Sequence, residues 1–190
     1  KITEILSQEK PVLSFEVFPP KKESGYETVE QAAVEIARLS PSFMSVTYGA
    51  GGGTSQYTAD LAACLAKKYG VTSMAHLTCV SSTREHVMGV VERLRENGIE
   101  NILALRGDVN PDIPPKTDFA HASDLVSYIR AHSDFGVSAA CYPEGHLESP
   151  DLVSDIRHLK EKVDAGAQHL VSQLFFDNED FFRFLERARI

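Results

Sequence analysis

The sequence has a deficit of positive charge, which excludes one class of function. Its 190 residues include 19 Lys and Arg against 27 Asp and Glu, so the formal net charge is −8 with every His neutral. Proteins that bind nucleic acid through bulk charge are basic instead. Apolar residues make up 43% of the chain and charged residues 24%, as in ordinary globular proteins. We therefore expect a packed core and no nucleic-acid partner.

Long hydrophobic runs and cysteines are also scarce. No stretch approaches the about 18 apolar residues that a membrane helix needs, and the first residues lack the hydrophobic core of a signal peptide. We therefore expect a cytoplasmic protein with no membrane partner. Cys64, Cys79 and Cys141 lie far apart and form no CxxC pair. They indicate buried thiols, and neither a disulfide framework nor a cysteine zinc site.

Six short segments rich in β-branched or aromatic residues have the composition of β-strands. Their centres fall about 30 residues apart, and helical patterns of apolar residues occupy the intervals. The expected strands are Val12–Phe18, Phe43–Tyr48, Thr72–Cys79, Asn101–Gly107, Val137–Tyr142 and His169–Phe176. The clearest helix begins at the capping box Ser82–Glu85 and ends at Asn97 and Gly98. Strands alternating with helices form parallel sheets, so the predicted fold class is α/β.

Two layouts fit this pattern: a doubly wound open sheet and a (β/α)8 TIM barrel. The GxGxxG motif of dinucleotide-binding open sheets is missing after the first strand. Polar residues lie instead at the C-terminal ends of several strands, where barrels build their active sites. These residues are Glu16, Thr47, His76, Arg106, Asp108 and Gln173. We favour the barrel, of which residues 1–190 would supply the first six of eight strand–helix units as one incomplete domain.

Glu16 is the first candidate for catalysis. It lies within an apolar strand, where ionising a carboxyl is costly unless the charge is paired, so its pKa should be raised. A raised pKa suits a general acid working near neutral pH. A structural Glu bound to a neighbouring strand is the alternative.

The tripeptide Arg106-Gly107-Asp108 follows a buried strand. Its Gly permits a close backbone approach, its Arg can bind phosphate in a bidentate manner, and its Asp places an anion at the strand mouth. A salt-bridged strand end is the alternative. The glycine-rich segment Ala50–Ser55 is similarly suited to an anion, but no Lys stands where a P-loop requires one. It indicates a ligand-facing loop.

The histidines do not predict a metal site. His76 and His146 lie near strand ends, yet no acid or histidine recurs at a metal-ligand spacing, so no metal is expected. His86, His132 and His158 fall on helical stretches and are expected at the surface.

Seven motifs in order together resemble the flavin-dependent methylenetetrahydrofolate reductases of bacterial type. The similarity extends from about residue 12 to residue 187. The motifs are Ser14–Lys21, Ser45–Gly52, Ala75–Cys79, Leu103–Asp108, Tyr142–His146, Lys162–Ala167 and Gln173–Asp177. The resemblance implies a (β/α)8 barrel that holds FAD at the C-terminal ends of its strands. It also implies a ping-pong reaction of one-carbon and methionine metabolism, in which NAD(P)H reduces FAD and methylenetetrahydrofolate then accepts the hydride to become methyltetrahydrofolate.

The resemblance also implies roles for individual residues. Glu16 matches the family's general acid, and Asp108 matches the catalytic aspartate near flavin and pterin. Thr47, Asp108 and Gln173 match positions that contact folate or nicotinamide. The positions that match FAD contacts are Thr47, Tyr48, Ala50, His76, Arg106, Gly107, Asp108, Ala140, Tyr142, His146, Asp155 and Lys162. Arg106 and Lys162 suit the pyrophosphate.

Three residues depart from the family pattern. His121 stands where relatives often have Tyr, Glu161 where a basic residue can occur, and Ser149 where a small apolar residue can occur. The missing seventh and eighth strands leave a second reading open, a truncated barrel that binds no flavin and has no activity. A phosphate-binding barrel aldolase would need a Schiff-base lysine on a strand, and no expected strand supplies one. A homo-oligomer is possible, and the sequence does not distinguish NADH from NADPH.

Overall fold

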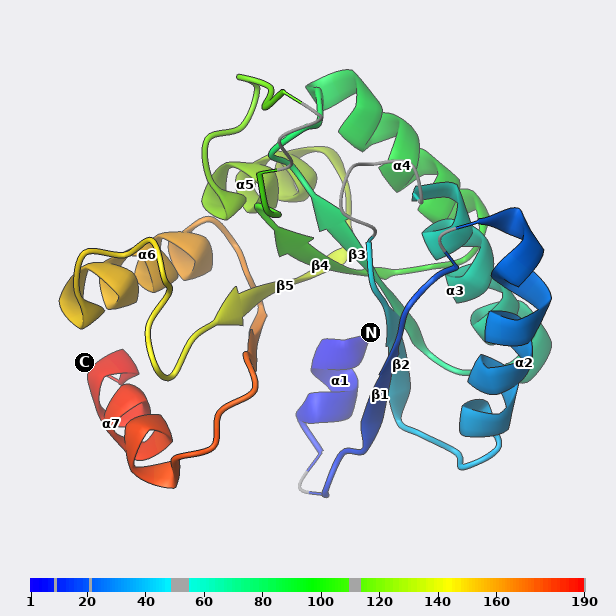
Figure 1. Ribbon diagram of the computed structural model, residues 1–190, viewed down its shortest axis with the longest axis horizontal. Coiled ribbons are helices and arrows are strands. Elements are labelled where there is room, and N and C mark those ends of the chain that lie inside the picture. Colours follow the sequence, from blue (N-terminus) through cyan, green and yellow to red (C-terminus); the bar gives the residue numbers. More distant parts are fainter. Residues whose placement is uncertain (9, 21, 49–54, 110–113, 190) are drawn as a thin grey trace.

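The computed structural model describes residues 1–189 except residues 9, 21, 49–54 and 110–113. Its centre is a six-stranded parallel sheet in which each strand pairs with the next along the chain. The strands are β1 (Ser14–Val17), β2 (Phe43–Val46), β3 (Ser73–Thr78), β4 (Asn101–Leu105), β5 (Gly136–Cys141) and β6 (His169–Ser172). Figure 1 shows that the sheet curls, with helices on its convex side. The chain therefore forms the α/β half-barrel predicted from the strand–helix alternation.

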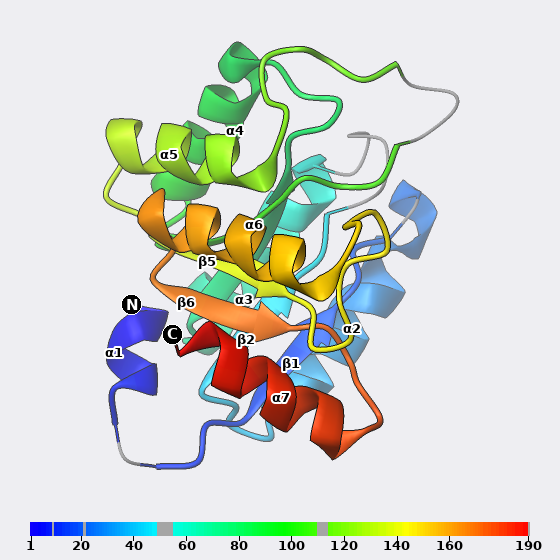
Figure 2. The same cartoon turned by 90° about the vertical axis from the view of Figure 1, so that its left-hand side faces the viewer.

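The chain also contains helices, most of which connect successive strands and cover the outer face. They are α1 (Ile2–Leu6), the short η1 (Glu23–Gly25), α2 (Tyr26–Ala37), α3 (Ser55–Tyr69), α4 (Arg84–Glu96), α5 (Ala122–His132), α6 (Leu152–Asp164) and α7 (Asn178–Ala188). The main core lies between the sheet and these helices, with Val46, Leu77 and Ile102 of the strands packed against residues such as Leu61 and Ile129. A smaller core joins β5 and β6 to α6 and α7, which flank β6 in Figure 2.

The structure places the N-cap of α4 at Thr83, one residue after the Ser82 that opens the expected capping box. Thr83 Oγ1 accepts a hydrogen bond from the backbone N–H of His86 at 3.1 Å, which satisfies one free amide of the first turn. After Asn97, Gly98 adopts a φ of +77°, a left-handed conformation that ends helices and that other residues rarely adopt. The expected helix is confirmed.

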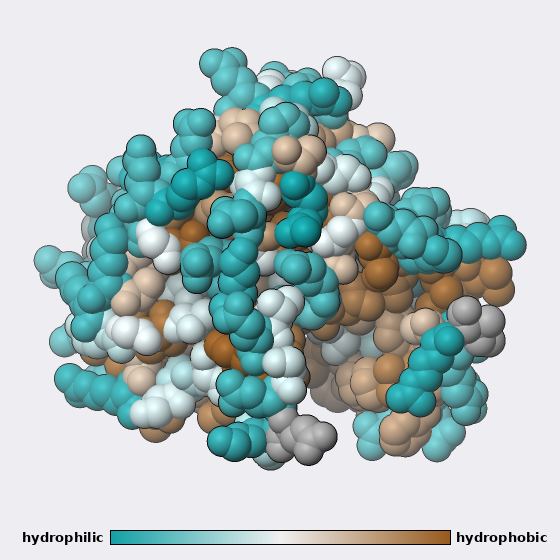
Figure 3. Space-filling model, turned by 180° about the vertical axis from the view of Figure 1, so that it is seen from behind, coloured by the Kyte–Doolittle hydropathy of each residue, from teal (hydrophilic) through white to brown (hydrophobic). Residues whose placement is uncertain are grey.

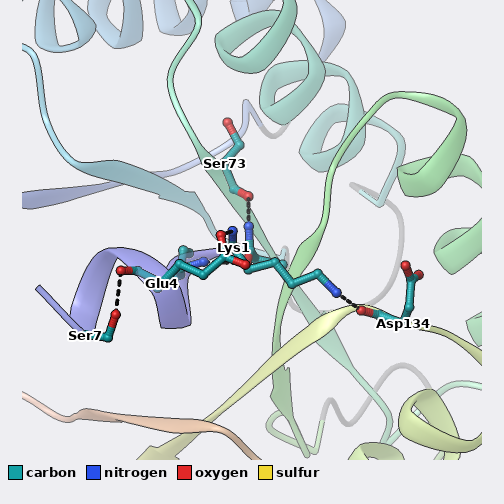
Figure 4. Close-up of polar contacts among 7 residues, drawn as sticks. Lys1, Glu4, Ser7, Ser73 and Asp134 are labelled. Carbon is teal, nitrogen blue, oxygen red and sulfur yellow. Dashed lines mark hydrogen bonds and ion pairs between the residues drawn. The ribbon is translucent and has the colours of Figure 1, made fainter.

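The N-terminal helix α1 covers the opposite end of the concave face from the strand mouths (Figure 1). Ile2 is fully buried against Phe43, Met74 and Leu103. Its backbone N–H donates to Asn101 Oδ1 at 3.0 Å. Figure 4 shows the polar contacts around α1, in which the Lys1 ammonium donates to the backbone carbonyl of Asp134 and the Ser7 hydroxyl to that of Glu4. The sequence analysis missed this helix, because five residues are too few to show helical periodicity.

The six expected strands all form; five are shorter than predicted, and the fifth keeps its length but begins one residue earlier, at Gly136. The first is reduced from Val12–Phe18 to β1, and the last from His169–Phe176 to β6. Both lie at the sheet's edges, where a strand has one partner and its ends gain little from pairing. The cysteines are buried as expected. Within the described ranges, no helix is long and apolar enough to cross a membrane.

Large apolar side chains are exposed near both edges of the sheet. They include Phe18 after β1 and Leu174 and Phe176 after β6, with Phe176 90% exposed. Phe182 of α7 is also exposed. From behind, Figure 3 shows hydrophobic residues gathered around a hollow on one side of the molecule. Open edges and exposed apolar groups of this size are unusual in a closed barrel.

Candidate active site

A pocket of about 390 Å³ opens at the C-terminal ends of the strands. Residues that follow β2, β4, β5 and β6 converge there, because parallel strands all end at the same edge. Its lining includes seven of the residues predicted from the sequence: Tyr48, Arg106, Gly107, Asp108, Tyr142, His146 and Gln173. The sequence therefore located the strand mouths correctly.

A second pocket of about 170 Å³ adjoins the first and shares Arg106, Tyr142 and His146 with it. It lies between the ends of β4 and β5 and the helices α5 and α6. Of the predicted residues, Ala140, Asp155 and Lys162 line only this pocket. The shared residues place the two pockets side by side at the strand mouths.

The backbone at the end of β4 permits only glycine. Gly107 has a φ of +85°, and a Cβ built there would lie 2.9 Å from Thr78 Cβ, closer than real carbon atoms pack. The chain can therefore turn tightly between Arg106 and Asp108 and direct both toward the pocket. The Arg106 guanidinium forms a two-pronged ion pair with Glu148, in which Nη2 lies 2.7 Å from Oε1. This pair lowers the pKa of Glu148.

Lys162 brings a cation into the second pocket from α6. Its ammonium donates to the Ala140 carbonyl at 3.0 Å and lies 5.6 Å from the centre of the Tyr142 ring. Burial lowers the pKa of Lys162, while the nearby Asp155 carboxylate acts in the opposite direction. Asp155 is itself buried and accepts a hydrogen bond from Ser149 Oγ at 2.8 Å.

Glu16 and His76 meet on the concave face, away from the linings of both pockets. Glu16 Oε2 lies 3.4 Å from His76 Nε2, although the two residues belong to β1 and β3 with β2 between them. Burial raises the pKa of Glu16, and a hydrogen bond from Ser45 acts in the opposite direction. The expected upward shift is therefore confirmed. Burial lowers the pKa of His76 to about 4, so the ring is neutral at pH 7.

The remaining predicted residues fall outside the pocket linings. Thr47 is buried directly after β2, where its N–H donates to the Val17 carbonyl and its carbonyl accepts from Thr58 Oγ1. Ala50, with most of the glycine-rich segment, lies outside the described residues.

The sequence analysis missed several pocket residues. His86 and His158 are exposed on helices, as expected, but His86 lines the first pocket and holds Tyr48 by a 3.1 Å contact between Nε2 and the hydroxyl. His158 lines the second pocket beside His121, with their ring centres 6.5 Å apart. Glu148 also gave no signal, because its partner Arg106 is 42 positions away. The one sequence signal for His86 is its place in the first turn of a helix that begins shortly after a strand ends.

A model of the methylenetetrahydrofolate reductase family matches residues 1–190. The chain belongs to this family. The Arabidopsis thaliana methylenetetrahydrofolate reductase (NADH) 1 is 38% identical over 204 residues, covering 100% of this chain and 34% of the plant protein. The Escherichia coli (strain K12) 5,10-methylenetetrahydrofolate reductase is 38% identical over 176 residues, covering 93% of this chain and 59% of its own. The chain thus spans roughly a third to three fifths of these methylenetetrahydrofolate reductases.

Solved structures support the fold alone. A phosphoenolpyruvate phosphomutase from Streptomyces platensis subsp. rosaceus superposes with a TM-score of 0.70 at 18% identity, covering 100% of this chain and 69% of that one. A Clostridium thermocellum protein described as binding two copies of 5-methyl-5,6,7,8-tetrahydrofolic acid superposes with a TM-score of 0.68 at 14% identity, covering 98% and 63%. Both likenesses cover nearly the whole half-barrel.

Proposed function

We propose that this chain carries most of the active site of an enzyme that reduces methylenetetrahydrofolate to methyltetrahydrofolate with NAD(P)H and FAD. The observation that carries the proposal is the pair of adjoining pockets at the strand mouths, in a chain that matches this family along its whole length. Folate as the substrate class agrees with the names of the relatives and with the tetrahydrofolate of the Clostridium thermocellum protein.

The residues of the two pockets fit FAD. Its pyrophosphate needs cations, and Arg106 and Lys162 place one cation in the shared lining and one in the second pocket. Gly107 lets the chain turn tightly between Arg106 and Asp108, so that both residues reach the lining of the first pocket. Tyr48, Ala140, Tyr142, His146 and Asp155 would complete the FAD contacts, as would Thr47, Ala50, His76 and Asp108. When bound, FAD would carry a hydride from NAD(P)H to the folate in two separate half-reactions.

Glu16 would supply the proton that folate reduction requires. Its side chain is 48% exposed, so a ligand on the concave side can reach it. With its pKa raised by burial, more of the carboxyl stays protonated near neutral pH than in an ordinary Glu. Donating that proton to a folate nitrogen would open the methylene bridge. Asp108, Gln173 and Thr47 would bind the folate or the nicotinamide, with the Asp108 charge also acting on the flavin.

The second candidate is a half-barrel without flavin or activity. It is favoured by the unpaired outer edges of β1 and β6 and by the exposed Phe176. We propose that residues 1–190 form one domain that two further strand–helix units would close. Gel filtration with a flavin assay on the purified chain separates the candidates, since only the first predicts flavin eluting with the protein.

Glu16→Gln tests the division of roles within the proposed reaction. Gln keeps the size of the side chain but cannot donate an acidic proton. We expect folate reduction to be abolished, while reduction of FAD by NAD(P)H in the absence of oxygen continues nearly as before. Glu144→Gln, an exposed residue in the segment between β5 and α6, is the matched control and should leave both half-reactions intact. Equal loss of both half-reactions in Glu16→Gln would reject this role.

A further inference from the structure

His76 has a buried nitrogen with no hydrogen-bond partner. Its side chain is only 7% exposed, and among the described residues Nε2 is the single shielded side-chain polar atom without a hydrogen bond. Such an atom destabilises the folded state, because it has lost its hydrogen bonds to water and forms none within the protein. The nearest candidate partner is Glu16 Oε2 at 3.4 Å, close enough that a small rotation of either side chain would complete a hydrogen bond.

Two proton arrangements would complete that bond while the two groups together hold one acidic proton. An imidazolium could face a carboxylate, or a protonated carboxyl could donate to the lone pair of a neutral ring. His76 is almost fully buried whereas the Glu16 side chain is 48% exposed, so the charged arrangement would place an imidazolium where it is poorly hydrated, and the neutral pair would not. Burial acts in the same direction on both residues, because it disfavours the anion of Glu16 and the cation of His76.

Few other groups act on this pair. Ser45, which lies beside Glu16 on β2, donates to the carboxyl. On β1, β2 and β3, the titratable groups that face the contact are Glu16 and His76 themselves. No charged side chain of the described residues shifts either group, so the location of the proton is decided by burial and by the hydrogen bond between them.

We propose that His76 is a positioning residue for Glu16: its neutral ring carries a proton on Nδ1 and accepts the Glu16 carboxyl proton at Nε2. His76 thereby holds the proton on the carboxyl and fixes the direction in which the carboxyl points. The half-exposed side of Glu16 remains open to a ligand. When the proton leaves for a base on that ligand, Glu16 becomes a carboxylate and His76 stays neutral. The catalytic use of the pair rests on the proposed function, but the pair itself does not.

Nuclear magnetic resonance on the complete chain without flavin tests the pair directly. Histidine ring nitrogens labelled with ¹⁵N report the tautomer, and ¹³C-labelled Glu carboxyls report ionisation. We expect His76 to carry its proton on Nδ1 and its Nε2 signal to change as Glu16 titrates. In Glu16→Gln the amide keeps the shape of the carboxyl and cannot titrate, so this step should vanish from the His76 signals. His132, exposed on α5, is the internal control and should be unaffected by Glu16→Gln.

Three results would overturn the pair: a proton on Nε2 of neutral His76, an imidazolium at the pH where Glu16 is ionised, or no response of His76 to Glu16 titration.

Kinetic measurements then test whether the pair acts in catalysis. If the chain reduces folate, His76→Met should move the high-pH limb of that half-reaction to lower pH, because Glu16 loses the nitrogen acceptor that retains its proton. A high-pH limb at the same pH in the variant and the unchanged chain would contradict the positioning role. A chain that shows the pair but binds no flavin would reject only the proposed function.

Discussion

Replacing Gly107 by Ala should destabilise the chain more than replacing Gly98, a glycine of similar backbone conformation. Gly107 has a φ of +85°, and an added Cβ would meet Thr78 Cβ at 2.9 Å and Thr78 Cγ2 at 3.2 Å. A non-glycine residue in the left-handed region costs about 1–2 kcal/mol. Forcing an extra carbon into a packed site costs about 1–3 kcal/mol more. The free energy of unfolding should therefore fall by about 2–5 kcal/mol.

Gly98 provides the matched control for this change. Its φ is +77°, but a Cβ there meets nothing within 4 Å, so Gly98→Ala carries the backbone cost without the contact. Urea unfolding of both variants followed by circular dichroism gives the two losses on one scale. The difference, about 1–3 kcal/mol, measures the contact with Thr78. Adding Thr78→Ser removes Cγ2 and should restore part of it. Equal losses in Gly107→Ala and Gly98→Ala would refute the close packing inferred at the end of β4.

Two further changes test separate parts of the structure. Ile2→Ala should lower the free energy of unfolding by about 2–4 kcal/mol, because Ile2 is fully buried against the concave face, whereas Leu6→Ala, half-exposed on the same helix, should change it far less. Similar losses in urea unfolding would contradict the packing of α1. Glu148→Gln should tighten FAD binding by no more than about fivefold, since an exposed ion pair with a small net gain no longer competes for Arg106. Fluorescence titration measures it against Glu144→Gln, and unchanged or weaker binding in Glu148→Gln would contradict the competition.

The parts of the fold set by local patterns were predictable. The existence of α4 with its end at Asn97 and Gly98, the six strands and the α/β class depend on neighbouring residues and on a period of strand and helix, and all can be read from one sequence, although the N-cap of α4 is Thr83 and not the expected Ser82. The extents of β1 and β6 could not be read in this way. Whether a residue at the end of an edge strand is paired depends on the adjacent strand in the folded sheet. The composition of the segment is the same whether or not that strand reaches it.

The candidate site divides in the same way. Arg106, Gly107 and Asp108 were identified because they follow a buried strand directly, and strand ends converge in a parallel sheet. The contacts of Glu148 with Arg106 and of His76 with Glu16 join residues 42 and 60 positions apart, and no spacing in the sequence predicts them. The buried, orphaned Nε2 of His76 became visible only when the curl of the sheet brought β1 and β3 together.

The visible absorption spectrum of the purified chain with FAD, followed by NAD(P)H without oxygen, tests the central claim most directly. The account predicts a flavin band that stays with the protein through gel filtration and bleaches when NAD(P)H is added, because the two pockets bring Arg106, Lys162 and Gly107 to one site. A chain that remains folded but colourless at saturating FAD would contradict the claim that these six strand–helix units hold the flavin.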